Sequence, residues 1–333
     1  MMADPRVRDI LDRSGWDAAV WGHPRGNIFC SWMWGEYKAR LGWNVRRIVI
    51  SDGAGDALAF IQYQEKVKGF ARFVHVQGGP LLTGKGEKQA EAAVGLLLDH
   101  LALGRLDLLA ADFKHFGSPA GVLAFLAHGF VPVVSSRDHT LEIDLTAGAE
   151  AILQGMKRDW RENLRRAERA AALSTRFLAD LDERLACFDA FSALYDDLRK
   201  RKGFDNNFNA KAYRDLVAAD PHHLILEVRD NDTLVHVRIA HLSSERCTDF
   251  FAASTEQARV SKAPSIAVWR LIERAISEGC KTFDWGGIDP AGNRGVYDFK
   301  RGLSKNVVQS GPLWLYGRIQ RLRDAAGAYL AFR

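Results

Sequence analysis

The chain has 333 residues, of which 47% are hydrophobic and 26% are charged. These values are typical of globular proteins, and they exclude a disordered chain, a fibrous repeat and a small disulfide scaffold. Lys and Arg number 46 against 41 Asp and Glu, so the net charge of +5 permits an anionic partner without requiring one. The length predicts about two domains.

The sequence shows neither a targeting signal nor a membrane span. The segment MMADPRVRDI (1–10) contains no apolar run, unlike a signal peptide. The most apolar stretch, Ala92–Leu103, is interrupted by Asp99 and His100 and is too short to cross a bilayer. We therefore expect a cytoplasmic protein without a transmembrane segment, with at most peripheral contact with the inner membrane surface.

The first half combines helices with an antiparallel hairpin. Trp34 and Lys38 lie four residues apart on one face of a predicted helix that Gly42 ends. A strand at Val45–Ser51 and another within Gly55–Gln64 are separated by a short polar turn, which predicts a hairpin. Two helix–strand pairs are predicted next: Gly95–Leu103 with Leu106–Ala110, and Pro119–His128 with Phe130–Val134.

A basic segment, Met156–Leu173, joins the two halves and is predicted to be helical. Its cations include Lys157, Arg158, Arg161 and Arg165. One interpretation is a solvated helix face with ion pairs between successive turns. The other is a face that contacts the phosphates of a nucleic acid.

The second half repeats the order of the first. A hairpin is predicted at His223–Val228 and Asn231–His241, followed by an amphipathic helix at Ser265–Glu278 and a strand at Lys281–Trp285. Gly279, between helix and strand, is typical of a left-handed helix cap. The recurrence predicts a duplicated mixed α/β (α+β) unit.

The cysteines and histidines give no metal-binding pattern. The four cysteines lie far apart without a C-x-x-C pair, so buried reduced thiols are predicted. His236 and His241 are five residues apart on a predicted strand and therefore face opposite sides of the sheet. We predict no metal site.

A glycine-rich segment, Phe283–Leu303, carries the strongest chemical signal. It contains neither a Walker loop nor G-x-G-x-x-G. Lys300 follows Phe299 near its end, and a lysine in such a place is able to stabilise an oxyanion or bind a phosphate. The alternative is a surface lysine on a turn. A second basic run, Arg199–Lys202, precedes a Gly-Phe turn; such runs are usually solvated, although an arginine at a turn can bind phosphate.

These segments, in this order, resemble the FemABX family of non-ribosomal peptidyl transferases, which add amino acids from aminoacyl-tRNA to peptidoglycan precursors. The resemblance extends over about residues 16–316. The matching motifs are W-x-x-x-K-x-x-x-G-W at 34–43, K-R-D-W-R-E-N-L-R-R-A at 157–167, R-K-G-F at 201–204, K-A-P at 262–264 and D-W-G-G-I-D-P…G-V-Y-D-F-K-R-G at 284–302.

The resemblance implies two tandem GNAT-like units, here expected at 1–147 and 148–315, with a C-terminal helix at 316–333 packing on the first. It implies that Lys38 and Arg201 bind the phosphates of a UDP- or lipid-linked muropeptide. It also implies that Phe299 and Lys300 lie at the aminoacyl ester of the tRNA. Asp112 falls where family members keep an acidic residue near the acceptor.

The chain departs from the family pattern at Asp249–Ser254, which contains no tyrosine where family members often have one. A tyrosine contact to the substrate is therefore not carried over. An aminoacyl ester on tRNA is already activated, so no ATP is needed at this step. No Ser-His-Asp or Cys-His arrangement is evident in the sequence, so we expect direct transfer to an acceptor amine, without a covalent enzyme intermediate and without a cofactor. Asp112 is the best candidate for the general base; a substrate phosphate and the tRNA ribose hydroxyl are the others.

Two alternatives remain open at the level of sequence. The first is a GNAT-type N-acyltransferase that uses acyl-CoA, for example in polysaccharide biosynthesis, although Gln257–Pro264 lacks the glycines of a pyrophosphate-binding loop. The second is a non-catalytic RNA-binding protein that uses the basic helix.

Overall fold

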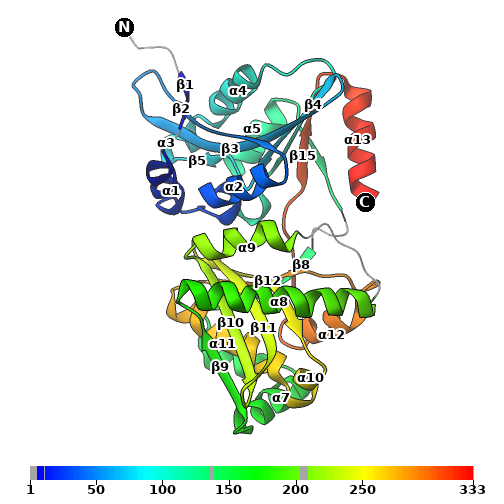
Figure 1. Ribbon diagram of the computed structural model, residues 1–333. Coiled ribbons are helices and arrows are strands. Elements are labelled where there is room, and N and C mark those ends of the chain that lie inside the picture. Colours follow the sequence, from blue (N-terminus) through cyan, green and yellow to red (C-terminus); the bar gives the residue numbers. More distant parts are fainter. Residues whose placement is uncertain (1–5, 11, 136–138, 203–208, 333) are drawn as a thin grey trace. The chain divides into compact units, whose positions relative to one another are not determined.

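The computed structural model describes residues 6–10, 12–135, 139–202 and 209–332 (Figure 1). The chain divides into two compact units. The first unit comprises residues 1–138 and 309–333, and the second comprises residues 139–308. Each unit is a mixed α/β structure with one large sheet, so the predicted duplication is confirmed.

The first unit contains a sheet in the order β1-β2-β3-β4-β6-β15-β7, with β5 paired to β3. Its strands are β1 (Arg6–Asp9), β2 (Asn44–Ser51), β3 (Ala57–Lys68), β4 (Ala71–Gln77), β5 (Leu81–Leu82), β6 (Leu108–Asp112), β7 (Val131–Val133) and β15 (Leu313–Tyr316). Its helices are α1 (Arg13–Trp21), α2 (Trp32–Arg40), α3 (Gly84–Lys88), α4 (Ala90–Leu101), α5 (Pro119–Ala127) and α13 (Gln320–Phe332), with short 3-10 turns at Ile28–Cys30 and Lys114–Phe116.

The core of the first unit lies between this sheet and the helices α4 and α5. Leu97 of α4 and Phe125 of α5 are fully buried, and they belong to the same cluster as Ile48 and Val74 of the sheet. The apolar residues of α4 recur at helical spacing, so the helix buries one face. Helix α13 packs with β15 and β7 through Ala326, Leu330 and Ala331.

The second unit contains a sheet in the order β14-β8-β13-β12-β11-β10-β9. Its strands are β8 (His139–Asp144), β9 (Leu173–Phe177), β10 (His223–Asp230), β11 (Thr233–Ser243), β12 (Arg246–Ser254), β13 (Thr282–Gly287) and β14 (Asn306–Gln309). Its helices are α6 (Gly148–Gly155), α7 (Arg158–Arg169), α8 (Leu181–Lys202), α9 (Ala210–Ala219), α10 (Gln257–Ser261), α11 (Ala263–Ser277) and α12 (Arg294–Arg301).

Helix α11 forms the centre of the second core. It buries Val268, Leu271 and Ile272 against the sheet, in one cluster with Trp285 of β13 and Leu164 of α7. Its end is set by Gly279 in the left-handed region (φ +78°), as the sequence predicted.

In each unit a helical connection joins two parallel strands, but the two parallel pairs differ. In the first unit β4 and β6 stay paired from Phe73↔Leu108 to Gln77↔Asp112. In the second, β12 and β13 pair only from Arg246↔Thr282 to Thr248↔Asp284 and then separate. A bulge in the neighbouring β11–β12 pair lies at the same level, between Ile239 and Ala240.

Some boundaries differ from the sequence prediction. The units divide at 138/139 and 308/309 instead of 147/148 and 315/316, because β8 pairs with β13 and β15 pairs with β6. The basic helix is shorter than Met156–Leu173: α7 ends at Arg169, and Leu173 begins β9, which the sequence analysis did not predict. The C-terminal helix begins at Gln320, because Leu313–Tyr316 is a strand.

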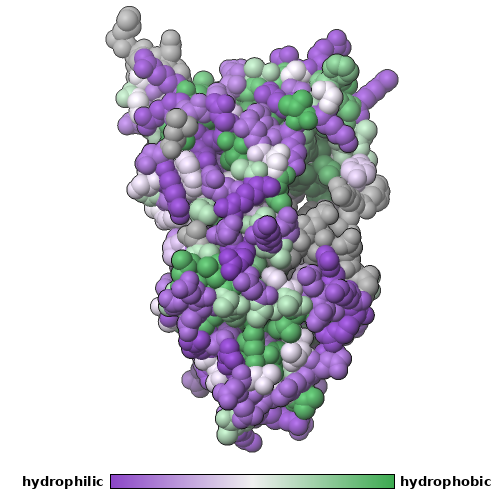
Figure 2. All heavy atoms as spheres, viewed as in Figure 1, coloured by the Kyte–Doolittle hydropathy of each residue, from purple (hydrophilic) through white to green (hydrophobic). Residues whose placement is uncertain are grey.

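All four cysteines are buried and free, as predicted. Burial raises the pKa of Cys30 to about 12, which makes this thiol unreactive. Among the described residues, none of the helices has the length and apolarity that crossing a membrane needs. Hydrophilic residues cover much of the face drawn in Figure 2, since the helices turn their apolar sides to the two cores.

Candidate active site

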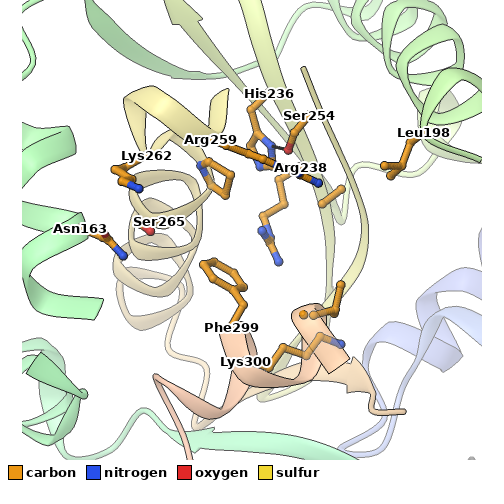
Figure 3. A pocket seen from close by; sticks show the side chains of 14 residues that line it. Asn163, Leu198, His236, Arg238, Ser254, Arg259, Lys262, Ser265, Phe299 and Lys300 are labelled. Carbon is orange, nitrogen blue, oxygen red and sulfur yellow. Dashed lines mark hydrogen bonds between the residues drawn. The ribbon is translucent and has the colours of Figure 1, made fainter. Parts of the chain in front are cut away.

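A cavity of about 540 Å³ lies beside the separated strands of the second unit. Ala252 and Ser254, in the part of β12 that has left β13, form one wall. The other walls come from β11 and from the helices α7, α8, α10, α11 and α12. Figure 3 shows side chains from these different elements gathered around one space. The fold thus creates the cavity by ending a strand pair early.

The cavity is cationic. Arg238, Arg259, Lys262 and Lys300 line it, and no carboxylate is among the described lining residues. Arg238 is already paired: its guanidinium donates to both carboxylate oxygens of Asp249, at 2.9 and 2.6 Å, and both side chains are buried. The other three cations leave a net positive surface that favours an anionic ligand.

Lys300 lies in the last turn of α12 and is only 9% exposed. Its ammonium donates to the carbonyl oxygens of Gly287 at 2.8 Å and Gly286 at 3.3 Å. Burial lowers the pKa of Lys300, and the charge of Asp249 partly offsets this. The alternative interpretation as a surface lysine on a turn is wrong, because the side chain lies inside the cavity wall.

Gly286 makes this arrangement possible. Its backbone has φ +69°, and a Cβ there would lie 3.0 Å from the carbonyl oxygen of Asp249. Only glycine fits both requirements. The glycine-rich sequence therefore brings β13 close to β12 where the strands part, and it presents two carbonyls to Lys300.

Phe299 lines the cavity from the same helix. Its ring lies 5.4 Å from that of Trp160 and 5.7 Å from that of Trp285. The indole of Trp160 also donates to the carbonyl oxygen of Phe299 at 3.1 Å. Helix α7 thus holds Phe299 and its neighbour Lys300 in place.

His236, which the sequence analysis did not select as a site residue, also lines the cavity. Its Nδ1 lies 2.7 Å from the hydroxyl of Ser254, and its buried Nε2 has no hydrogen-bond partner. Burial, assisted by the charge of Arg238, lowers the pKa of His236 to about 3, so the imidazole is neutral at pH 7. A single histidine on a strand gives no motif; its position opposite Ser254 follows from the β11–β12 register.

The basic helix α7 turns different residues to the core and to solvent. Trp160, Leu164 and Ala167 are buried. The four residues predicted to bind tRNA lie elsewhere on its surface: Lys157, Arg158 and Arg165 are exposed and Arg161 is half-buried. Asn163 of the same helix lines the cavity. Arg161 and Arg165 lie two residues from Asn163, so they point to a different side of the helix.

Lys38 and Asp112 lie in the first unit. The Lys38 ammonium lies 5.0 Å from the ring centre of Trp34; burial lowers its pKa, and the charge of Asp112 raises it. Asp112 accepts from His75 at 3.0 Å and from the Gly78 backbone at 3.2 Å. Burial by itself raises the pKa of Asp112, but the charge of Lys114 and these bonds outweigh it, so the net shift is downward.

Arg201 lies at the end of α8 in the second unit, and its guanidinium pairs with Glu256 at 3.1 Å. Both side chains are largely exposed. Gly203 and Phe204 of the R-K-G-F motif lie outside the described residues. Because Lys38 and Arg201 belong to different units, their joint role in binding phosphate stays a prediction.

Comparisons with known proteins agree on the fold. Residues 154–301 match the family described as "Acetyltransferase (GNAT) domain". No protein of curated function matches the sequence. The crystal structure of FemX is 14% identical, with a TM-score of 0.79 over 97% of this chain and 100% of that chain.

Two further structures share the fold at lower similarity. The C-terminal domain of a putative lysylphosphatidylglycerol synthetase from Agrobacterium fabrum is 14% identical, with a TM-score of 0.56 over 82% of this chain and 84% of that chain. L-PGS from Bacillus licheniformis is 12% identical, with a TM-score of 0.53 over 82% and 85%. The chain therefore has the fold of FemX, with two tandem GNAT-like units, and its second unit carries a GNAT acyltransferase domain.

Proposed function

We propose that the protein transfers an amino acid from aminoacyl-tRNA to an amine of a UDP- or lipid-linked muropeptide. The observation that carries this proposal is the cationic cavity in which Lys300 is buried. The 3′ end of tRNA is polyanionic and ends in an ester, so it needs both positive charge and a donor at the carbonyl. The full-length similarity to FemX supports the same reaction class.

Lys300 is suited to stabilise the transition state. The acceptor amine attacks the ester carbonyl, and the carbonyl electrons move to oxygen to form a tetrahedral oxyanion. Collapse breaks the bond to the ribose oxygen of the terminal adenosine, which leaves with a proton from the amine. An ammonium has three N–H donors, and two are held by Gly286 and Gly287, so one remains for the oxyanion.

The other cavity residues fit the tRNA donor. The ring of Phe299 is fixed by Trp160 and Trp285, so it can stack on the terminal adenine with little loss of side-chain entropy. Arg165 and its exposed neighbours on α7 face solvent, where they are able to contact backbone phosphates of the tRNA body outside the cavity.

The acceptor side of the proposal rests on the family resemblance. We assign Lys38 and Arg201 to the phosphates of the muropeptide and Asp112 to the acceptor amine. The lowered pKa of Asp112 keeps its carboxylate ionised, the form that a base needs, and also makes it a weaker base than an ordinary carboxylate. We place the reaction in the cytoplasm, with peripheral contact with the membrane where the acceptor is lipid-linked.

The family match favours a second candidate, an N-acyltransferase that uses acyl-CoA. Arg259 and Lys262 flank the start of α11, where they could bind the pyrophosphate of CoA. The segment Gln257–Pro264 forms the short helix α10 and the first residues of α11, without the glycines that let a backbone wrap a pyrophosphate. We therefore rank it second.

Mass analysis of the muropeptide distinguishes the candidates. The protein is incubated with UDP-MurNAc-pentapeptide and charged total tRNA, and in parallel with uncharged tRNA or with acetyl-CoA. We expect a mass increase of one amino acid with charged tRNA alone. An acetyl increase would support the second candidate. The same reactions are repeated with the lipid-linked precursor as acceptor. If the protein binds tRNA but neither donor gives a product with either acceptor, the result would support a non-catalytic RNA-binding protein.

A further inference from the structure

Three buried side chains of the second unit meet outside the cavity. The Oδ2 atom of Asp220 lies 3.0 Å from Nε2 of His241 and 3.3 Å from Nδ1 of His223. These three atoms all lie within 4.8 Å of one another. Both histidines are 0% exposed and Asp220 is 3% exposed. The donor set, two imidazoles and a carboxylate, is one that divalent zinc prefers.

The backbone holds these residues in place before any ligand arrives. His223 and His241 are direct partners across the antiparallel β10–β11 pair, so their side chains share one face of the sheet. Asp220 follows the last turn of α9, where its amide donates to the carbonyl of Leu216. The guanidinium of Arg184 donates to the backbone carbonyl of Asp220 and not to its carboxylate. The two strands and the helix end therefore fix the spacing.

Each side chain also has an outer hydrogen-bond partner, which for Asp220 is the backbone amide of His222, donating to Oδ1 at 2.9 Å. Nδ1 of His241 lies 2.9 Å from the hydroxyl of Ser243, and Nε2 of His223 lies 3.3 Å from that of Tyr213. Metal-bound histidines characteristically make such bonds, because they orient the ring and select the tautomer. The inward Nδ1 of His223 is buried and has no hydrogen bond of good geometry, although Asp220 lies beside it.

We propose that Asp220, His223 and His241 bind a structural Zn²⁺ ion that ties α9 to β10 and β11. In a tetrahedral zinc site with bonds of about 2.0–2.1 Å, neighbouring ligand atoms lie about 3.3 Å apart, close to the two distances observed here. A water completes the four ligands. The burial of all three side chains excludes substrate, so the ion would contribute folding stability and no catalytic step. The site is independent of the proposed transfer reaction.

Zinc content and affinity test the site on the full-length protein. Metal analysis of the purified protein should give one equivalent of zinc, and Co²⁺ added after chelation should give a visible spectrum of low-symmetry coordination. Calorimetric titration with Zn²⁺ should show one site, and its occupancy should raise Tm by several degrees. A protein without zinc, Co²⁺ spectrum or Zn²⁺ binding would overturn the proposal and leave a hydrogen-bonded triad.

Substitutions locate the ion. Asp220→Asn and His241→Gln should lower zinc affinity by more than about 100-fold, whereas Tyr213→Phe, which removes only an outer partner, should lower it by about 10–100-fold. His128→Gln, at a half-buried position of the first unit, is the matched control. Circular dichroism identifies variants that fail to fold. The Co²⁺ spectrum of the wild-type protein tests the site even if every variant fails to fold. Folded ligand variants that keep zinc at wild-type affinity would contradict the assignment.

Discussion

The two units share one strand order around their parallel pair and differ in how far that pair extends. In the first unit β4 and β6 remain paired to Gln77↔Asp112, and the Gly78 amide extends the contact by donating to the Asp112 carbonyl at 2.7 Å. In the second unit pairing stops at Thr248↔Asp284, and the cavity lies beside the gap. We call the first unit the closed unit, because its parallel strands stay paired here, and the second unit the open unit, because its parallel strands separate.

This difference shows how a duplicated fold can divide its work. In the closed unit the carboxylate of Asp112 bonds to His75 and Gly78, and so it fastens the two strands together. In the open unit the carboxylate of Asp249 pairs instead with Arg238. The ammonium of Lys300 donates to the carbonyl oxygen of Gly287, at the end of β13 that has separated from β12. Substitutions in each unit test whether the open copy performs the transfer while the closed copy positions the acceptor.

The largest effect is expected for Lys300→Met in the open unit. This change removes the charge and keeps the length of the side chain, so transfer should fall by about 10²–10³-fold, the loss seen for one oxyanion donor. Turnover should fall more than acceptor affinity, because the contact strengthens in the transition state. Lys305→Met, at an exposed position, is the control for loss of one lysine. A folded Lys300→Met protein that transfers at the wild-type rate would remove Lys300 from the mechanism.

The pH dependence of transfer gives a second measure of Lys300. The oxyanion contact needs the ammonium, and burial lowers the pKa of Lys300 below 10.5. The rate should therefore decline with rising pH before a free lysine would lose its proton. Lys300→Arg should move this decline upward while restoring only part of the rate, because the guanidinium places its charge differently. An identical alkaline limb in both proteins would assign the decline to another group.

In the closed unit, Asp112→Asn should have two separable effects. Loss of the charged acceptor should lower the free energy of unfolding by about 1–3 kcal/mol, measured by urea denaturation. If the carboxylate also removes the proton of the acceptor amine, turnover should fall by about 10²-fold. A destabilised variant with wild-type turnover would restrict Asp112 to fastening β4 to β6 and return the base to the substrate phosphate or the ribose hydroxyl.

Lys38→Ala and Arg201→Ala test the acceptor site with one substitution in each unit. Each should weaken binding of UDP-MurNAc-pentapeptide by about 1.5–3 kcal/mol, the range for hydrogen bonds to charged groups, and leave tRNA binding unchanged. Calorimetry measures the first and filter binding the second. Normal precursor binding by both variants would exclude a joint phosphate contact.

A smaller effect concerns acid stability of the open unit. The pKa of His236 is about 3 in the folded protein and near 6.5 in the unfolded chain, so its stabilising contribution is complete above pH 6.5 and is lost as the pH falls toward 3. The expected loss between pH 7 and pH 5 is on the order of 2 kcal/mol. His236→Asn should flatten this dependence in urea titrations; an unchanged slope would show that other groups cause it.

The smallest effect is expected for Arg165→Gln on the basic helix. One phosphate contact fewer should weaken tRNA binding several-fold and reduce the slope of log K against log salt by about 1. Arg105→Gln, an exposed position of the first unit, should leave both unchanged. Equal slopes for the two variants would place the tRNA elsewhere.

The local sequence predicted the helices and strands better than it predicted which strands pair with one another. The hairpins, the helix ends at Gly42, Gly129 and Gly279, and the duplication follow from short-range patterns, and the structure has them. The motif at 284–302 singled out Lys300, but its burial depends on where β12 leaves β13, which is a property of two distant segments.

Pairing over long distances explains what the sequence did not reveal. His236 belongs to no motif, and its partner Ser254 lies beside it only through the register of β11 with β12. In the same way, β8 belongs to the second unit because it pairs with β13, and β15 belongs to the first unit because it pairs with β6. Neither short strand shows these partners in its own sequence. The grouping of Asp220, His223 and His241 depends on a register that composition and spacing leave undetermined.

The position of β15 has a consequence for biosynthesis. In the sheet of the first unit, β15 lies between β6 and β7, yet it is made after the whole second unit. When residues up to 308 have left the ribosome, the nascent chain contains every strand of the second sheet except the end of β14. The first sheet still lacks β15, the strand that pairs with β6. The second unit can therefore complete its fold first, and the first unit must keep an open strand edge until the last 25 residues of the chain, 309–333, emerge.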